Sequence, residues 1–538
     1  MSSACPVYGI HLSPGIDETE VVLSWSSPCD DIHEVSYRLR GMAVHNPLSP
    51  PSTTPRRDLA AYLPLSGPSI SKALVTSVTY SADDLCGPAR GPPGPWTARH
   101  ATLSGLRPGS MYEYWVGDDQ YGATLSNFRT PPASPVASQT FLSVQDMGTP
   151  PEYPGAAAVM RFLHHEVDQG AAHIIIGGDV AYGDGDQSAW DRFVDLVEPV
   201  ARHIPLAVGV GNHEWGCDAP DAAALGGSAP YIAADKSGGE CAIPLRSRFP
   251  MPEARAGEVD ASTSSRLSSN PPHWYSYKYG GAHVVVLNTE VRLDAGSPQR
   301  EWLVDDLQKV DRCLTPWVLV SMHRPMYTTY SKHFKQVAHG LRAAVEDLFL
   351  EHGVNLVLSG HTHRYERTCA VARKECVGEE AGGIYHIITG SGGHKITGQG
   401  SDHHKQYMEQ SIASFGFAKV EMHDGETATV SFIGVDDEAS SVLDTFDVRN
   451  VHYAAGCANR ASNIMEFYPV NESHPVSVPL SISPHGAGLP LDKVVPGGSL
   501  AGTGVSTAVL AYAAGPGTRV VHVLLLLVVL LTQVLVAM

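Results

Sequence analysis

The sequence predicts an N-terminal all-β sandwich followed by a larger α/β domain, and three observations predict this fold class. From about residue 7 to 130, short strand-like runs alternate with turn residues and show no helical period. Beyond about residue 140, apolar runs alternate with longer helical stretches, as they do in α/β domains. A chain of 538 residues is also too long for one ordinary domain, and its 43% of hydrophobic residues can fill large cores.

The β-sandwich is expected over residues 7–130. Its strand-like runs lie at 21–25 (VVLSW), 73–80 (ALVTSVTY) and 111–116 (MYEYWV), with Pro-rich insertions near 48–55 and 91–95. The segment 101–109 (ATLSGLRPG), with the Tyr112 and Tyr114 strand after it, resembles the end of a fibronectin-type module. Such sandwiches usually serve as spacers or docking surfaces, so we expect no chemistry in this one.

The rest of the chain divides by composition. The run TPPASP at 130–135 marks a linker, which we assign to 131–140. The α/β domain is expected over 141–450, with helices near 155–168, 297–311 and 335–352. A stretch rich in Gly, Pro and Ser at 451–519 is predicted to be a stalk, and 520–538 is an apolar tail.

Net charge and cysteine usage limit the function classes. A formal charge of −19 argues against a nucleic-acid partner, although a local metal ion can still attract phosphate to an acidic protein. The nine cysteines form no CxxC pair, which argues against a zinc ribbon. Cys369 and Cys376 flank a short polar stretch, as in a disulfide-closed hairpin, and Cys217 and Cys241 could likewise close a loop. The alternative is scattered thiols in a reducing compartment. A glycosylation sequon at Asn471 agrees with an oxidising one.

The two ends of the chain give different indications of where the protein is located. Residues 1–20 hold no basic stretch followed by an apolar run, so no signal peptide is visible. The tail at 520–538 would span about 28 Å as a helix, close to the hydrocarbon thickness of a bilayer. It is expected to be either a GPI-attachment signal, removed after small residues such as those at 506–508, or a retained membrane anchor. A truncated or mis-started N-terminus would reconcile the two ends, and we expect an extracellular or cell-surface protein anchored at its C-terminal end.

Five strand-like runs in the α/β domain end in residues that can bind metal. The five blocks are QDMG at 145–148, GGDVAY at 177–182, GNHE at 211–214, SMH at 321–323 and SGHTH at 359–363. The carboxyl ends of strands in such a sheet share one edge, where ligands bind, and glycines there allow sharp turns. Each block alone is more often a turn or a structural histidine. Their occurrence together, each after an apolar strand, predicts one site.

The side chains in these blocks favour hard or borderline metal ions. Carboxylate, amide oxygen, phenolate and imidazole without thiolate suit iron, zinc or manganese. Seven ligands suit two ions if one carboxylate bridges them, and such a pair about 3.5–4 Å apart can clamp the attacking and leaving oxygens of a displacement reaction.

The five blocks resemble the purple acid phosphatases of the calcineurin-like metallophosphoesterase superfamily. The resemblance covers residues 7–450, including the N-terminal sandwich of the larger family members, and implies a catalytic domain of two mixed sheets between helices. Tyr182 is the most discriminating residue, because related Ser/Thr phosphatases and phosphodiesterases generally lack a tyrosine ligand.

The resemblance implies a role for each residue of the site. Asp146, Asp179, Tyr182 and His363 would hold a ferric ion, whereas Asp179, Asn212, His323 and His361 would hold a divalent ion, either Zn, Mn or Fe. Asp179 would bridge the two ions. His213 would contact phosphate or the leaving group, and His333, ten residues after His323, would be a second such histidine.

The implied activity is acid hydrolysis of phosphate monoesters by a metal-bound hydroxide. One alternative is a phosphodiesterase or nucleotide pyrophosphatase, because pocket shape and not the ligand set selects the substrate on this scaffold. A non-catalytic, membrane-anchored binding protein is a further alternative, but a protein of that kind normally loses a ligand, and here all seven are present.

The apolar tail generates a prediction about membrane attachment. If 520–538 is a GPI signal, phosphatidylinositol-specific phospholipase C is expected to release active protein from intact cells, because this phospholipase cleaves the anchor between its lipid and its glycan. Release by detergent alone would instead indicate a spanning tail.

Overall fold

The computed structural model describes most of the first 457 residues. The described residues are 6–28, 32–40, 70–117, 124–133, 138–215, 229, 236–253, 269–330, 332–398, 406–453 and 457. Cys217, Asn471 and the tail at 520–538 lie outside them. Most of the expected stalk at 451–519 also lies outside them, with only 451–453 and 457 described, and so does part of the linker. The predicted domain limits therefore stay predictions.

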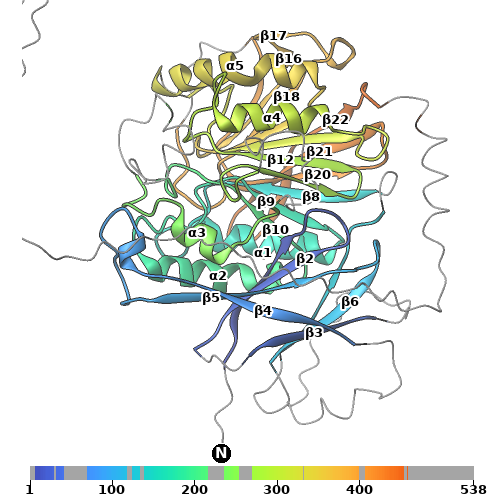
Figure 1. Ribbon diagram of the computed structural model, residues 1–538. Coiled ribbons are helices and arrows are strands. Elements are labelled where there is room, and N and C mark those ends of the chain that lie inside the picture. The colour runs from blue at the N-terminus through green and yellow to red at the C-terminus, as the bar shows by residue number, and fades with distance from the viewer. Residues whose placement is uncertain are drawn as a thin grey trace, which may run out of the picture. The chain divides into compact units, whose positions relative to one another are not determined.

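The N-terminal part forms the predicted all-β sandwich (Figure 1). Its strands are β1 (Tyr8–Pro14), β2 (Val21–Ser26), β3 (Glu34–Leu39), β4 (Ser71–Tyr80), β5 (Trp96–Leu103), β6 (Met111–Val116) and β7 (Thr124–Arg129). They pair in the order β1-β2-β5-β4-β3-β6-β7. The start of β4 pairs with β3 and its later residues pair with β5, so one strand passes between the two halves. Trp25, Val35 and Tyr114 from both halves are buried in one core.

The first sheet of the α/β domain begins with a β-α-β-α-β unit. It comprises β8 (Gln139–Val144), α1 (Gly155–Asp168), β9 (His173–Ile176), α2 (Gln187–Ala201) and β10 (Leu206–Val208), with the three strands parallel. The antiparallel strands β20 (Phe415–Met422), β21 (Thr427–Val435) and β22 (Ser440–Arg449) extend it beyond β8.

The second sheet is also mixed. Its order is β11-β12-β13-β14-β18-β15-β19, and β12, β13, β14 and β18 are parallel. The strands are β11 (Tyr275–Tyr279), β12 (Ala282–Leu287), β13 (Trp317–Met322), β14 (Leu356–Ser359), β15 (Tyr365–Thr368), β18 (Tyr385–Thr389) and β19 (Met408–Ile412). The helices α4 (Pro298–Gln308) and α5 (Lys332–Glu351) connect the parallel strands. Smaller elements are α3 (Ile243–Arg248), the hairpin β16 (Val371–Ala372) and β17 (Glu375–Cys376), and the 3-10 turns Ala82–Asp84 and Glu379–Ala381.

The two sheets pack face to face and helices cover their outer faces. Phe141 and Ile175 of the first sheet share a buried core with Val285 and Leu319 of the second. Figure 1 shows α4 and α5 on one side of the paired sheets and α1 and α2 on the other. The predicted fold class, a sandwich followed by two mixed sheets between helices, is confirmed, and the predicted helices near 155–168, 297–311 and 335–352 correspond to α1, α4 and α5.

The sandwich is bonded to the α/β domain at defined points. The Gly9 amide on β1 donates to Glu198 Oε2 of α2 at 2.7 Å. His11 Nε2 lies 3.0 Å from the carbonyl oxygen of Arg248, and His100 Nε2 lies 3.1 Å from that of Ser247, both in α3. A disulfide between Cys86 and Cys241 also crosses from the β-rich part to the α/β domain. The sandwich therefore acts here as a docked domain and not as a free spacer.

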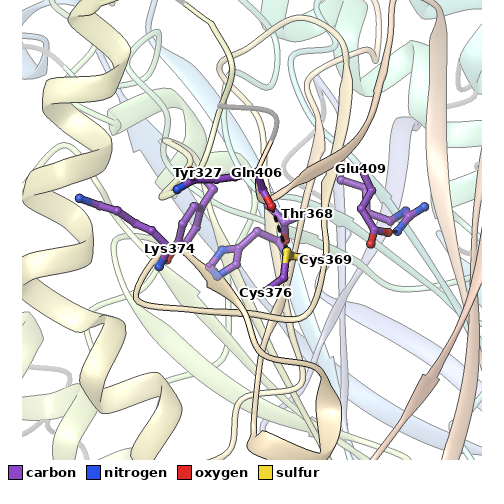
Figure 2. Close-up of a disulfide and its surroundings, with 9 residues drawn as sticks. Tyr327, Thr368, Cys369, Lys374, Cys376, Gln406 and Glu409 are labelled. Carbon is purple, nitrogen blue, oxygen red and sulfur yellow. Dashed lines mark hydrogen bonds and ion pairs between the residues drawn. A yellow bond between two sulfur atoms is a disulfide. The ribbon is translucent and has the colours of Figure 1, made fainter. Parts of the chain in front are cut away.

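Two further disulfides involve the α/β domain, and one of them reaches Cys457 in the expected stalk. The predicted Cys369–Cys376 hairpin bridge is present, and Cys313 pairs with Cys457. In Figure 2 the Cys369–Cys376 bridge lies beside Tyr327, whose hydroxyl accepts a bond from the Lys374 amide at 3.1 Å. The suggested loop between Cys217 and Cys241 is wrong, because Cys241 pairs instead with Cys86, which is distant in sequence but close in the fold.

No helix among the described residues is both long and apolar enough to cross a membrane.

Candidate metal centre

The five predicted blocks converge where the carboxyl ends of both sheets meet. Three of them follow β8, β9 and β10 of the first sheet, and two follow β13 and β14 of the second. Each strand is buried, and the polar side chains begin where the strand ends. The structure thus brings together side chains that are more than 200 residues apart, such as Asp146 and His363, whose Oδ1 and Nε2 atoms are 3.2 Å apart.

Several of these residues have a backbone that L-amino acids rarely adopt. The φ angles of Asp146, Asp179, Tyr182 and His361 are 59°, 50°, 51° and 64°. Such conformations cost on the order of 1–3 kcal/mol each and persist where surrounding contacts compensate. Two glycines allow the backbone of one turn to lie against a carboxylate of another. A Cβ at Gly211 would overlap the Asp179 carboxylate, and a Cβ at Gly360 would overlap that of Asp146.

Glu214 holds two of the strand ends together. Its buried carboxylate accepts hydrogen bonds from the backbone amides of Asp179, Val180 and Gly211, each at 2.8 Å. The bonds join the turn after β9 to the turn after β10, so they stabilise the strained backbone at Asp179. Sequence reasoning included Glu214 in a motif but assigned it no role.

The first group of ligand atoms surrounds Asp146. Ligand atoms of Asp146, Asp179 and His363 lie within 4.8 Å of one another. The Tyr182 hydroxyl joins them, 3.0 Å from Asp146 Oδ1 and 3.2 Å from His363 Nε2. These are the four residues expected to hold the ferric ion.

The second group surrounds His323. Ligand atoms of Asp179, His323 and His361 lie within 4.8 Å of one another. His323 Nε2 is 3.1 Å from Asn212 Oδ1, 3.2 Å from His361 Nδ1 and 3.3 Å from Asp179 Oδ2. These are the four residues expected to hold the divalent ion. Asp179 belongs to both groups, as a bridging carboxylate must.

The donor chemistry of the two groups fits cations. The carboxylates of Asp146 and Asp179 are fully buried, and isolated buried charges are costly unless a cation compensates them. Oxygen and imidazole nitrogen atoms point at one another across about 3 Å, the arrangement expected around ions bound by O and N ligands. The assignment of individual residues to individual ions stays a prediction.

Tyr182 is a phenol that needs a cation to lose its proton. Burial raises the pKa of Tyr182 well above its usual value, and the charges of Asp146 and Asp179 raise it further. The ring is packed between others, with centroids 4.4 Å from His213 and 4.7 Å from Tyr153. Its oxygen is therefore held in place beside Asp146.

His213 lies at the edge of the two groups. Its backbone amide donates to Asp179 Oδ1 at 3.0 Å, and its Nδ1 is 2.7 Å from Asp184 Oδ1. Burial alone would lower the pKa of His213, but the Asp179 charge and the bond to Asp184 raise it to about 9. The second histidine expected here, His333, is in the first turn of α5, and its side chain is outside the described part of the structure, so its role stays a prediction.

Other residues near the centre were given no role from the sequence. Asp184 lies five residues after Asp179 in an acidic turn, which resembles an ordinary loop. His394 packs its ring 4.0 Å from that of His363 and 4.9 Å from that of Tyr182, and its amide donates to the Asp146 carbonyl at 3.1 Å. Arg324, directly after His323, forms an ion pair with Glu290.

Two family models match the α/β domain. Residues 145–365 match the calcineurin-like phosphoesterase model, and residues 383–445 match the model described as iron/zinc purple acid phosphatase-like protein C. The first match begins beside Asp146 and ends just after His363, so it contains all five blocks.

Curated plant proteins are similar over much of the chain. Purple acid phosphatase 22 of Arabidopsis thaliana is 30% identical over 362 residues, covering 66% of this chain and 73% of that protein. Purple acid phosphatase 15 of the same plant is 28% identical, covering 71% and 69%. Probable inactive purple acid phosphatase 9, also from Arabidopsis thaliana, is 30% identical over 60% of this chain but only 51% of its own length.

A solved structure supports the fold. The purple acid phosphatase PPD1 from yellow lupin seeds superimposes with a TM-score of 0.67 at 22% identity, covering 82% of this chain and 74% of that one. The structure of PhoD gives a TM-score of 0.53 at 12% identity, covering 84% and 91%.

The shared position of Asp179 generates a prediction about metal content. Asp179→Asn is expected to lower binding of both ions and to abolish hydrolysis of phosphate esters, because it removes the carboxylate that both groups use. His323→Ala changes one group only and is expected to lose about one of two ions, again without hydrolysis. Metal analysis of purified protein measures both, with the exposed Asp294→Asn as control. Full metal content and normal turnover in Asp179→Asn would show that the two groups do not share it.

Proposed function

The chain belongs to the purple acid phosphatase family, and from this premise we propose that it hydrolyses phosphate monoesters at one ferric and one divalent ion. Membership makes it a metallophosphoesterase with a binuclear metal centre. The observation that supports the proposal best is the pair of ligand groups that share Asp179, with the Tyr182 oxygen in one group only. Two unlike groups favour two unlike ions.

The chain's own residues would hold the two ions as the geometry groups them. Asp146, Tyr182 and His363 would hold the ferric ion, and Asn212, His323 and His361 would hold the divalent ion, either Zn, Mn or Fe, with Asp179 between them. When bound, such ions lower the pKa of coordinated water and neutralise phosphate charge, which provides a nucleophile in acid.

His213 is the side chain best placed to handle a proton at the leaving group. Its Nδ1 faces Asp184, which orients the ring and leaves Nε2 for another partner. Its backbone is tied to Asp179, so the ring stays beside the metal ligands. We assign Nε2 of His213 to protonating the leaving oxygen, with Asp184 as the residue that positions it.

A non-catalytic role has less support. A binding protein descended from an enzyme normally loses part of its centre, whereas here all seven expected ligand side chains are present and within reach of one another. The choice between monoesters and diesters depends on pocket shape. The test is hydrolysis of 4-nitrophenyl phosphate beside bis(4-nitrophenyl) phosphate. Faster turnover of the monoester is expected, and faster turnover of the diester would contradict the proposal.

Attachment to an extracellular membrane surface is a proposal that rests on the sequence. The apolar composition of 520–538 and the sequon at Asn471 support it, and disulfides in the α/β domain agree with an oxidising compartment. The release experiment with phospholipase tests it.

The role of His213 generates a prediction about leaving groups. His213→Ala is expected to keep both ions and to lower kcat by about 10²–10⁴-fold, because it removes a proton donor. The loss should be smaller for 4-nitrophenyl phosphate than for an alkyl phosphate, whose alkoxide needs the proton more. Asp184→Asn should show the same trend to a lesser degree. Equal losses for both substrates would make His213 a group that positions phosphate.

The oxygen of Tyr182 generates a prediction about colour. Phenolate bound to ferric iron gives a charge-transfer band, so the oxidised enzyme is expected to absorb visible light. Tyr182→Phe keeps the buried ring but removes the oxygen 3.0 Å from Asp146, so the band should vanish while part of the activity remains. Tyr153→Phe, which alters the stacked neighbour, is the control and should keep the band. A colourless ferric wild type would exclude Tyr182 as a ligand.

A further inference from the structure

A sixth strand end reaches the metal centre, from β12. The residues that follow β12 are Asn288, Thr289 and Glu290, all fully buried. The Arg324 amide donates to Thr289 Oγ1 at 3.1 Å, which ties this turn to the one after β13. Arg324 directly follows the expected ligand His323, so its guanidinium lies at the divalent side of the centre.

The guanidinium is held by two parallel bonds. Arg324 Nε donates to Glu290 Oε1 at 2.7 Å, and Nη2 donates to Glu290 Oε2 at 2.8 Å. Such a bidentate pair fixes the plane of the guanidinium group. Its third nitrogen, Nη1, is 2.8 Å from Nε2 of His361. Arg324 is therefore a fixed cation whose remaining edge faces a residue of the metal centre.

The contact with His361 is one that metal binding would change. His361 Nδ1 is the atom that faces His323 at 3.2 Å. If Nδ1 ligates an ion, the neutral ring carries its hydrogen on Nε2. Arginine can only donate, so Arg324 Nη1 and His361 Nε2 would then both present hydrogens to each other. Two converging donors require a common acceptor, and an anionic oxygen is the best one.

An ion pair of this kind needs a reason beyond stability. A buried Arg–Glu pair costs desolvation and is often no more stabilising than apolar side chains of similar size. Only 9% of the Arg324 side chain and 1% of that of Glu290 are exposed. The Arg324–Glu290 pair is neutral overall, so what it contributes is direction: it holds the third guanidinium nitrogen toward the ligand groups, where an anionic phosphate oxygen can accept a hydrogen bond.

We propose that Arg324, held by Glu290, is a phosphate-binding residue of this enzyme, and that its Nη1 together with Nε2 of His361 donates to a phosphate oxygen of substrate and product. The inference rests on the proposed function, because it takes phosphate esters as substrates. It assigns a task to the end of β12, which contributes no metal ligand.

The test measures binding of inorganic phosphate to the metal-loaded enzyme by calorimetry. The main variant is Arg324→Met with Glu290→Gln, which removes both charges at similar volume and leaves no unpaired ion. Its phosphate Kd is expected to rise about 10- to 100-fold, the loss typical of a charged hydrogen bond, with metal content unchanged. Arg324→Gln alone leaves Glu290 uncompensated, so its Kd should rise further.

Matched controls separate this role from a structural one. Arg367 forms a similar buried bidentate pair with Asp444 outside the two ligand groups and also pairs with the exposed Glu409, which water can solvate when Arg367 is replaced. Arg367→Met with Asp444→Asn should leave the phosphate Kd unchanged. Phosphate binding within about twofold of wild type in both Arg324 variants would overturn the inference. So would loss of bound metal in proportion to the loss of phosphate, because Arg324 would then act only by positioning His361.

The same data separate this inference from the proposed function. If the wild-type enzyme cleaves 4-nitrophenyl phosphate and binds phosphate while the Arg324 variants bind it equally well, only the inference fails. If the metal-loaded wild type neither binds phosphate nor cleaves the ester, both fail.

Discussion

The site depends on one buried carboxylate, that of Asp179, because both groups of ligand atoms share it. Its position has a cost, since the backbone has a φ of 50° and the charge is almost fully removed from water. Glu214 offsets part of that cost, because its carboxylate accepts hydrogen bonds from the backbone amides that follow β9 and β10. A bound cation would offset the rest. The buried charge of Asp179 lowers the stability of the metal-free protein. The same charge favours cation binding at the site.

The positions of the other expected ligands depend on how the two sheets pack. Asp146 and Asn212 follow strands of the first sheet, whereas His323 and His361 follow strands of the second. Distances of about 3 Å between them exist only because a continuous apolar core fixes one sheet against the other. The docked sandwich adds bonds and a disulfide to this assembly without supplying a metal ligand. Its bonds reach α2 and α3.

The groups around the metal ligands follow a common pattern in which a basic side chain is held by an acidic one. His213 is paired with Asp184, and Arg324 is paired with Glu290. Each carboxylate orients its partner and keeps the net charge small, which allows the basic group to stay partly buried. An acidic chain can in this way receive an anionic substrate at one place. Bound metal ions would supply most of the positive charge, and the paired side chains supply direction.

The sequence by itself determined the fold class and the family, and it predicted the residue types of the centre. Each block of expected ligands directly follows an apolar run, which the local sequence shows to be a buried strand. Because parallel strands share one carboxyl edge, the blocks are expected at the same edge of the sheet. Only the tertiary structure decided that Glu214, Asp184 and the Arg324–Glu290 pair support the two ligand groups, and that Cys241 pairs with Cys86 instead of Cys217. These features join residues on separate elements, up to 155 positions apart for the disulfide. A local pattern of apolar residues predicts which polar residue lies at the end of a strand. The side chain that it meets depends on how the sheets pack, which no local pattern contains.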